Sequence, residues 1–172
     1  MIIFINGSFG VGKTTVAELL VQRIPQSMLY DPEEVGFFLR NIVRPIETFD
    51  DFQDLTIWRT LVITTAKLLR ETYERTLIMP MTIWNRSYFA EIMQGLRQIE
   101  PDLYHFCLIA SRDTLYQRLQ SRENSAQATT WATERIERCV ESFQSSEFAV
   151  QIDTEGKTPE AIVAEIEKCI VV

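Results

Sequence analysis

The residues with the clearest chemical meaning form a loop close to the amino end of the chain. Residues 7–14 read Gly-Ser-Phe-Gly-Val-Gly-Lys-Thr and match the phosphate-binding pattern G-x-x-x-x-G-K-[ST] in full. Backbone N–H groups of such a loop surround phosphate oxygens, the lysine reaches the β- and γ-phosphates, and the hydroxyl binds Mg²⁺. We therefore expect ATP and Mg²⁺ as cofactors. The expected ATP-binding residues here are Gly7, Ser8, Phe9, Gly10, Val11, Gly12, Lys13, Thr14 and Thr15.

A carboxylate follows the second apolar run of the chain. Asp31 comes directly after residues 27–30, and ligands of parallel sheets bind beyond the carboxyl ends of the strands. A hydroxyl that attacks a phosphoryl group needs its proton accepted, so Asp31 is the candidate general base. Lys13 is expected to stabilise the charge that develops during catalysis. Asp31 and Thr14 are also the candidate metal ligands. The alternative is that Asp31 only caps its helix, and the two roles are compatible.

Two arginines indicate a lid. Arg118 and Arg122 are four residues apart and thus share one helix face, just before the polar stretch 123–130. A lid over residues 118 to about 138 could close on the nucleotide and bring guanidinium groups against phosphate. We expect Arg122 to stabilise charge in catalysis, and Arg118 to bind ATP together with Thr154, which follows the fifth strand. The alternative is a solvated charged helix face.

The acceptor side is expected between residues 32 and 58, where aromatic residues alternate with cations. Aromatic faces suit a flat ring, and arginine suits phosphate or carbonyl oxygens. The alternative is that single aromatic residues such as Trp58 pack the core. A carboxylate that supports the metal is normally expected at the end of a buried strand, but residues 77–82 contain no acid. Thr14 and Asp31 would therefore have a larger part in binding Mg²⁺. The expected substrate-binding residues are Phe37, Arg40, Trp58, Arg59, Met81, Thr82 and Arg135.

Short apolar runs alternate with longer segments of helical spacing, the pattern of a parallel sheet covered by helices. The expected strands are 2–6, 27–30, 76–81, 104–110 and 148–152. The expected helices are 14–23, 32–41, 52–74, 86–99, 112–122, 130–143 and 159–170. We therefore expect a three-layer α/β fold of the P-loop NTPase, nucleotide-kinase-like type, with five parallel strands, helices on both faces and a short lid. No linker interrupts the pattern, so residues 1–172 are expected to form one domain.

Composition restricts the classes of molecule that the protein is expected to bind. The formal net charge of −7 argues against general affinity for nucleic acid or anionic lipid, which demand a basic surface. The three cysteines, Cys107, Cys139 and Cys169, lack metal-ligand spacing and are expected as reduced, buried thiols. No apolar stretch approaches the roughly 18 residues that span a bilayer. We expect a cytoplasmic protein whose partners are a nucleoside triphosphate and a small-molecule acceptor.

Several longer phrases resemble one family. MIIFINGSFGVGKT, YDPEEVGFFLR, PMTI, HFCLIAS, LYQRLQSR and ERCVE together resemble the tunicamycin-resistance proteins, P-loop ATP-binding proteins similar in fold to nucleoside, nucleotide and shikimate kinases. The resemblance implies ATP binding by residues 7–15, acceptor activation by Asp31 and lid roles for Arg118 and Arg122. It also implies that the family lacks an acid in the third strand, so this absence is not by itself a sign of an inactive enzyme. Some members continue into a membrane-touching amphipathic segment, and this chain is expected to lack such an anchor.

Two classes of function follow from these residues together with what the resemblance implies about the ligand. The first is an ATP-dependent phosphotransferase that acts on a hydroxyl of a nucleoside-like compound, with a role in tunicamycin resistance. The second is an ATP-binding protein that sequesters its ligand without a chemical reaction. The absence of an acid in residues 77–82 favours this second class. A housekeeping nucleoside, nucleotide or shikimate-like kinase is a further alternative. A regulatory GTPase is disfavoured, because the sequence has no N-K-x-D motif.

Overall fold

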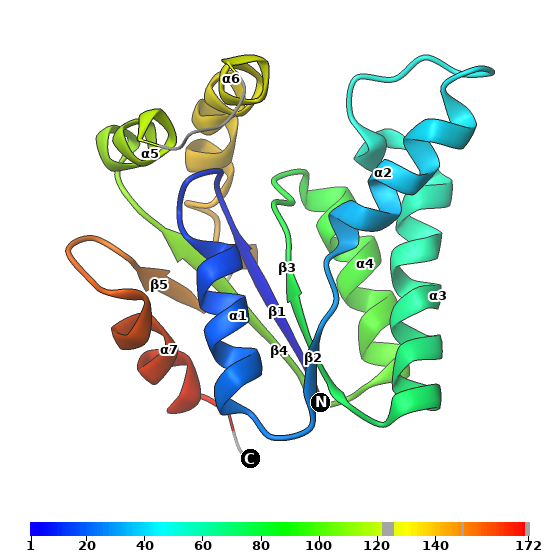
Figure 1. The fold of residues 1–172 in the computed structure, drawn as a ribbon, viewed down its shortest axis with the longest axis horizontal. Helices are drawn as coiled ribbons and strands as arrows, with labels where there is room; N and C mark the ends of the chain where they lie inside the picture. Colours follow the sequence, from blue (N-terminus) through cyan, green and yellow to red (C-terminus); the bar gives the residue numbers. More distant parts are fainter. Residues whose placement is uncertain (122–125, 149, 171–172) are drawn as a thin grey trace.

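A five-stranded parallel sheet forms the centre of the molecule. The computed structural model describes residues 1–121, 126–148 and 150–170 (Figure 1). The strand order is β2-β3-β1-β4-β5, and every neighbouring pair is parallel. The strands are β1 (Ile2–Gly7), β2 (Ser27–Leu29), β3 (Thr76–Pro80), β4 (Leu103–Ile109) and β5 (Gln151–Asp153). The predicted parallel sheet is confirmed. The fifth strand begins later than predicted, because Phe148 belongs to the buried 3₁₀ helix η2 (Ser146–Phe148).

The apolar strands are buried on both faces, as their near-continuous hydrophobicity predicts. Successive side chains of β1 alternate between the two sides of the sheet. Ile2 and Phe4 pack in one core cluster, whereas Ile3 and Ile5 pack in the other. All four side chains are completely buried. The central strand is therefore packed on both sides, and this packing fixes the position of the loop at its carboxyl end.

The helices cover the two faces of the sheet and extend beyond its carboxyl edge. They are α1 (Lys13–Arg23), α2 (Pro32–Val43), α3 (Thr56–Tyr73), α4 (Arg86–Ile99), α5 (Arg112–Gln120), α6 (Ala126–Ser142) and α7 (Pro159–Glu167). Helices α1 and α7 pack together against one face, and α3 and α4 pack together against the other. In Figure 1, α5 and α6 lie on one side of the loop after β1, and α2 lies on the opposite side. Helices α2 and α6 thus flank the expected ligand edge.

The single helix predicted over residues 52–74 is interrupted, which corrects that prediction. Residues Phe52–Asp54 form a 3₁₀ helix, η1, and α3 starts only at Thr56. Leu55 between them is extended, with φ −73° and ψ 117°. The side chain of Asp51 accepts a hydrogen bond from the Gln53 N–H at 3.0 Å and so caps η1 as a separate turn. The break directs Phe52 and Gln53 towards the edge of the sheet that carries the expected site.

Two further expectations concern the surface. Cys107 and Cys139 are buried as predicted, but Cys169 is exposed, because it follows the end of α7 instead of facing the core. Within the described residues, every helix is too short or too polar to cross a bilayer.

Candidate functional site

Asn6 anchors the start of the phosphate loop. Its side chain is fully buried, and its Oδ1 accepts hydrogen bonds from the N–H groups of Gly7 and Ile83, both at 2.9 Å. Its Nδ2 donates to the carbonyl oxygen of Ile83 at 3.0 Å. One buried amide therefore satisfies three backbone groups and ties the loop to the segment that follows β3.

The loop has the backbone shape that surrounds an anion. Gly10 and Gly12 adopt φ values of +80° and +102°, which side-chain-bearing residues rarely adopt. In the described part of the chain, no side chain caps the first turn of α1, so its N–H groups point to the position of a bound phosphate. Lys13 Nζ donates to the Ser8 carbonyl oxygen at 2.9 Å across the loop. Thr14 and Thr15 are exposed beside it. These residues fit a nucleotide polyphosphate.

Two carboxylates are influenced by the charge of Lys13. Asp31 caps α2, where its Oδ1 accepts from the Glu33 N–H at 2.9 Å. Burial raises the pKa of Asp31 above its ordinary value, and the positive charge of Lys13 acts in the opposite direction. Burial likewise raises the pKa of Glu33, and Lys13 is the main influence that lowers it. The charge of the phosphate-loop lysine therefore favours the ionised form of both carboxylates.

Glu33 was not predicted as a functional residue. It lies in the first turn of α2. The available signal was its spacing of two residues from Asp31, at the carboxyl edge of the sheet. The structure makes Glu33 part of the wall of a cavity next to the phosphate loop.

This cavity, of about 780 Å³, lies between α2, η1, α6 and the phosphate loop. Four of the predicted substrate-binding residues, Phe37, Arg40, Met81 and Arg135, line it. Phe9 of the phosphate loop also lines it, so the expected nucleotide site and the cavity share a wall. Aromatic walls with a few charged groups suit a small ring-containing ligand.

Trp131 connects α6 to the phosphate loop, a contact that the sequence did not reveal. Its ring meets the ring of Phe9 edge-on, with centroids 5.2 Å apart. The guanidinium of Arg135 lies 3.9 Å from the centroid of Trp131. Across the cavity, Arg40 lies over Phe37 at 5.7 Å and over Phe52 at 5.5 Å. Each cavity wall therefore carries an arginine stacked on aromatic rings.

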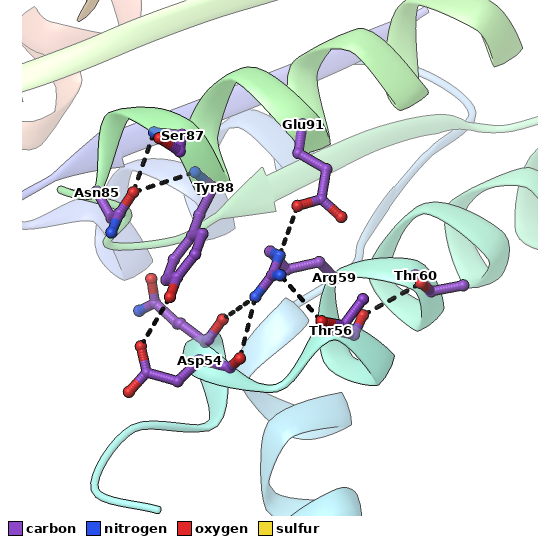
Figure 2. A network of polar contacts seen from close by, with 9 residues as sticks. Asp54, Thr56, Arg59, Thr60, Asn85, Ser87, Tyr88 and Glu91 are labelled. Atoms are coloured by element: carbon purple, nitrogen blue, oxygen red, sulfur yellow. Dashed lines mark hydrogen bonds and ion pairs between the residues drawn. The ribbon is translucent and has the colours of Figure 1, made fainter.

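Two of the predicted substrate-binding residues, Trp58 and Arg59, are not among the residues that line the cavity. Trp58 is completely buried, and its Nε1 donates to the Pro32 carbonyl oxygen at 3.1 Å. Figure 2 shows the contacts of Arg59. Its Nε donates to Glu91 at 2.6 Å, its Nη1 donates to the Gln53 carbonyl oxygen at 2.6 Å, and its face lies 4.2 Å from the Tyr88 ring centroid. Arg59 therefore holds η1 in place.

Gln53 extends this network towards the phosphate loop. Its Nε2 donates to the carbonyl oxygen of Thr82 at 2.9 Å, and Gln53 itself lines the cavity. Thr82 is buried, and its hydroxyl has no hydrogen-bond partner in the described part of the structure. Thr82 thus contributes its backbone to the support of η1, and its side chain is not part of the cavity wall.

Arg118 and Thr154, both predicted ATP-binding residues, meet behind the phosphate loop. Arg118 Nη1 donates to the Thr154 hydroxyl at 3.0 Å and to the Val11 carbonyl oxygen at 3.3 Å. Its Nη2 donates to the Thr154 carbonyl oxygen at 3.0 Å. The helix after β4 and the loop after β5 are thereby joined to the phosphate loop. The predicted catalytic residue Arg122 lies outside the described residues.

Thr14 and Asp31 are the residues that could hold Mg²⁺. The described residues contain no group of three or more His, Cys, Asp or Glu side chains that suits a metal ion. Mg²⁺ in phosphoryl-transfer sites usually takes one or two protein ligands, together with water and substrate phosphates. An exposed hydroxyl at the start of α1 and a carboxylate near Lys13 fit that role.

Comparison with solved structures shows which proteins share this fold. The solved tunicamycin resistance protein of Deinococcus radiodurans is similar, with a TM-score of 0.80 and 26% identity over 98% of this chain and 94% of that one. A sugar kinase from Janibacter sp. HTCC2649 has a TM-score of 0.68 and 16% identity over 97% and 92% of the two chains. A shikimate kinase from Acinetobacter baumannii has a TM-score of 0.64 and 15% identity over 98% and 91%.

The last two likenesses show the fold alone, because their identities are low. No curated protein matches the chain significantly. The AAA domain family matches residues 2–146, which is most of the chain. With its five parallel strands and its phosphate loop, the chain belongs to the AAA domain family and has a P-loop kinase-like fold.

Proposed function

We propose that this protein transfers the γ-phosphoryl group of ATP to a hydroxyl of a nucleoside-like small molecule. The likeness to a tunicamycin resistance protein supports a role in resistance to that antibiotic. The observation that carries the proposal is the position of Asp31 and Glu33. The positive charge of Lys13 acts on both carboxylates, and Glu33 lines the cavity whose wall includes Phe9 of the phosphate loop. A base, a phosphate site and an acceptor cavity therefore adjoin one another.

The reaction assigns a role to each of these groups. The phosphate loop and Lys13 hold the β- and γ-phosphates and neutralise the charge that develops on them. The acceptor oxygen bonds to the γ-phosphorus while the bond to the bridging β–γ oxygen breaks, and ADP leaves. The hydroxyl proton passes to Asp31, which its hydrogen bond to the Glu33 N–H holds in place. Thr14 and Asp31 would hold Mg²⁺, and the ion would supply further charge neutralisation at the phosphates.

A second function, capture of the ligand without transfer, is supported by one observation. The segment after β3, Met81 and Thr82, provides no acid for the metal site, and both residues are buried. A site with a weakly held metal would bind ATP and a ligand but transfer phosphate poorly. The two functions therefore differ in whether a phosphorylated product forms.

The test is to incubate the protein with Mg²⁺, ATP and a panel of nucleosides that includes tunicamycin. Mass spectrometry then measures a phosphorylated product, which appears at an increment of one phosphoryl group. Lys13→Ala removes the ammonium group that binds the phosphates. It serves as the negative control for both functions, because each requires bound ATP. Product from the wild type excludes simple capture. Its absence with every compound, together with tight ligand binding, would refute transfer and favour capture.

Two carboxylate variants identify the base. We expect Asp31→Asn to lower kcat about 10²- to 10⁴-fold while the affinity for ATP stays nearly unchanged, since a general base contributes about that much. Glu33→Gln is the matched comparison, because it removes the neighbouring carboxylate and leaves Asp31 capping α2. A full rate in Asp31→Asn together with a comparable loss in Glu33→Gln would transfer the role of base to Glu33.

A further inference from the structure

The wall of the site cavity combines balanced charge with one buried polar residue. Three acids and three arginines line it among the described residues, so their formal charges cancel: Glu33, Asp50, Glu134, Arg40, Arg44 and Arg135. All six are at least partly exposed. Gln53, by contrast, is 5% exposed, and it is the one polar residue of the described lining that is buried. A ligand group that meets Gln53 must lose its water, so this residue has the strongest means to select a neutral ligand.

The hydrogen bond of the Gln53 side chain fixes which end of its amide is free. Nε2 donates to the Thr82 carbonyl oxygen at 2.9 Å. A carbonyl oxygen can only accept, so the amide nitrogen must face Thr82 and Oε1 must lie on the other side of the amide. A flipped amide would place two acceptors against each other.

The Oε1 atom of Gln53 is unused and accessible. Within the described part of the chain, the hydrogen bonds of Gln53 run from its N–H to Asp51, from Nε2 to Thr82 and from Arg59 to its carbonyl oxygen, and none involves Oε1. Oε1 is also not among the described side-chain atoms that are closed to solvent and lack a partner. Because the residue lines the cavity, Oε1 is open to a ligand there. A hydrogen-bond donor on that ligand would satisfy it.

The backbone of Gln53 is held in place before any ligand binds. Its N–H donates to Asp51 Oδ1 at 3.0 Å, and its carbonyl oxygen accepts from Arg59 Nη1 at 2.6 Å. Arg59 is itself fixed by Glu91 and by the ring of Tyr88. A binding group that is already ordered loses little entropy when the ligand arrives.

The same amide is linked to the phosphate loop through the segment after β3. Thr82, which accepts from Gln53, is followed by Ile83, whose N–H and carbonyl oxygen both bond to the side chain of Asn6. Asn6 Oδ1 also accepts from the Gly7 N–H at the start of the loop. A ligand edge bound to Gln53 therefore has a fixed position relative to the bound phosphates.

Aromatic rings from several elements surround this polar group. Phe52 of η1 and Phe37 of α2 meet edge-on with centroids 6.0 Å apart, and both line the cavity. Phe9 of the phosphate loop and Trp131 of α6 line it as well, with centroids 5.2 Å apart. Aromatic walls suit the faces of a flat ring and leave its edge to polar groups such as Gln53.

We infer that Gln53 selects the acceptor by accepting a hydrogen bond at Oε1 from an N–H group on the edge of a flat, uncharged heterocycle. This inference rests on the proposed function, because it takes the cavity as the acceptor site. The N–H can belong to an exocyclic amino group, as in adenine and cytosine, or to the ring, as in uracil. A ring without such a donor leaves a dehydrated acceptor unpaired, and this loss is the source of the selectivity.

The experiment compares nucleosides that differ in this donor. The pairs are adenosine with purine riboside, cytidine with pyrimidin-2-one riboside, and uridine with 3-methyluridine. The first two pairs remove an amino group without adding bulk, and the third removes a ring N–H. Calorimetry measures binding to the full chain with Mg²⁺ and a non-hydrolysable ATP analogue present, so that the nucleotide site is filled. We expect the donor compound of at least one pair to bind roughly fivefold to hundredfold tighter than its partner.

Two variants assign the preference to the amide. Gln53→Met keeps an unbranched side chain of similar length but removes the acceptor, so the ratio of affinities within the pair should fall to about twofold or less. Arg59→Gln is the matched control, because it removes the support of the Gln53 carbonyl oxygen and keeps the amide. It should weaken both compounds of a pair by the same factor and so preserve their ratio. Melting curves and the affinity for the ATP analogue check that each variant folds.

Several outcomes would overturn the inference. Equal affinities within every pair contradict it, and so does a preference that survives in Gln53→Met. A ratio that Arg59→Gln abolishes as fully as Gln53→Met would assign Gln53 to the support of η1 alone. Absence of binding by all six compounds at millimolar levels also contradicts it.

These binding results are separate from the fate of the proposed function. A preference for the donor compounds without any phosphorylated product under Mg²⁺ and ATP would refute transfer and leave the role of Gln53 intact. Phosphorylation of a hydroxyl compound that has no N–H on its ring, with no preference within the pairs, would refute the role of Gln53 and leave transfer intact.

Discussion

At the scale of single residues, Glu33 combines burial with negative charge. Burial raises its pKa, Lys13 opposes the rise, and Asp31 and Asp51 add to it by repulsion. The folded state therefore holds the Glu33 proton to a higher pH than the unfolded chain does. The stability that this proton provides is complete below the unfolded pKa and is lost as pH rises through the folded pKa. At neutral pH the ionised carboxylate lowers the stability of the fold, as is common for functional groups.

We expect Glu33→Gln to raise the Tm at pH 7 by about 2–6 °C, from a typical gain of 0.5–2 kcal/mol. The difference from the wild type should shrink as pH falls towards 4, because the wild-type carboxyl group then becomes protonated. Melting curves from pH 4 to pH 8 measure both effects. Glu34→Gln is the control, because Glu34 is exposed in the same helical turn. A lower Tm for Glu33→Gln at pH 7, or a difference independent of pH, would refute the explanation.

At the scale of elements, the contact between α2 and η1 shapes the cavity. Gly36 of α2 faces Phe52 of η1 so closely that an added Cβ would lie 2.6 Å from the ring. An aromatic ring cannot bend away as a flexible side chain can. The glycine therefore lets α2 approach η1 and places Phe52 beside Arg40. Arg59 secures η1 from the other side through the Gln53 carbonyl oxygen.

We expect Gly36→Ala to cost about 1–3 kcal/mol of stability, because it overpacks the contact. Displacement of Phe52 should also weaken acceptor binding about tenfold, while the affinity for ATP remains within about twofold. Calorimetry with each ligand measures this difference.

Gly95→Ala is the matched control for this substitution. An added Cβ at Gly95 would lie 2.5 Å from the tip of the Ile63 side chain, in the contact between α4 and α3. It should destabilise the fold without changing either affinity, because Ile63 and Gly95 lie outside the site cavity. An equal loss of acceptor binding in both variants would show that the affinity responds to overall stability and not to the position of Phe52.

At the scale of the whole molecule, the phosphate loop is tied to both halves of the sheet. Asn6 bonds it to the segment after β3, and Arg118 bonds it to Thr154 after β5. A ligand that orders the loop therefore stabilises strands on both sides of β1. Ligands that bind only the folded state raise its stability by mass action.

A non-hydrolysable ATP analogue with Mg²⁺, at about 100 times its Kd, should stabilise the fold by about 2.7 kcal/mol. For a chain of this length, that corresponds to a rise in Tm of roughly 5–10 °C. Scanning calorimetry measures the shift, and Lys13→Ala should abolish it. An unchanged Tm for the wild type at millimolar analogue would contradict nucleotide binding and, with it, the proposed function.

The sequence by itself determined the features that depend on contiguous residues. The phosphate loop requires glycines, a lysine and a hydroxyl at fixed spacing, and the strands require unbroken apolar runs, so residues 7–14 and the parallel sheet could be predicted. Asp31 as the cap of α2 was equally local, because its partner is the Glu33 N–H. Such patterns act over a few residues and need no knowledge of the rest of the fold.

Only the tertiary structure decided which side chains share the cavity. Arg40 and Arg59 have similar surroundings in the sequence. In the structure, however, Arg40 lines the cavity, whereas Arg59 donates hydrogen bonds to Glu91 and to the Gln53 carbonyl oxygen. Packing of distant segments brings the Trp131 ring against Phe9 and lets the charge of Lys13 act on Glu33. The physical reason is that a polar side chain is free to bind a ligand only if the fold leaves its hydrogen bonds unused, and that depends on neighbours far apart in the chain.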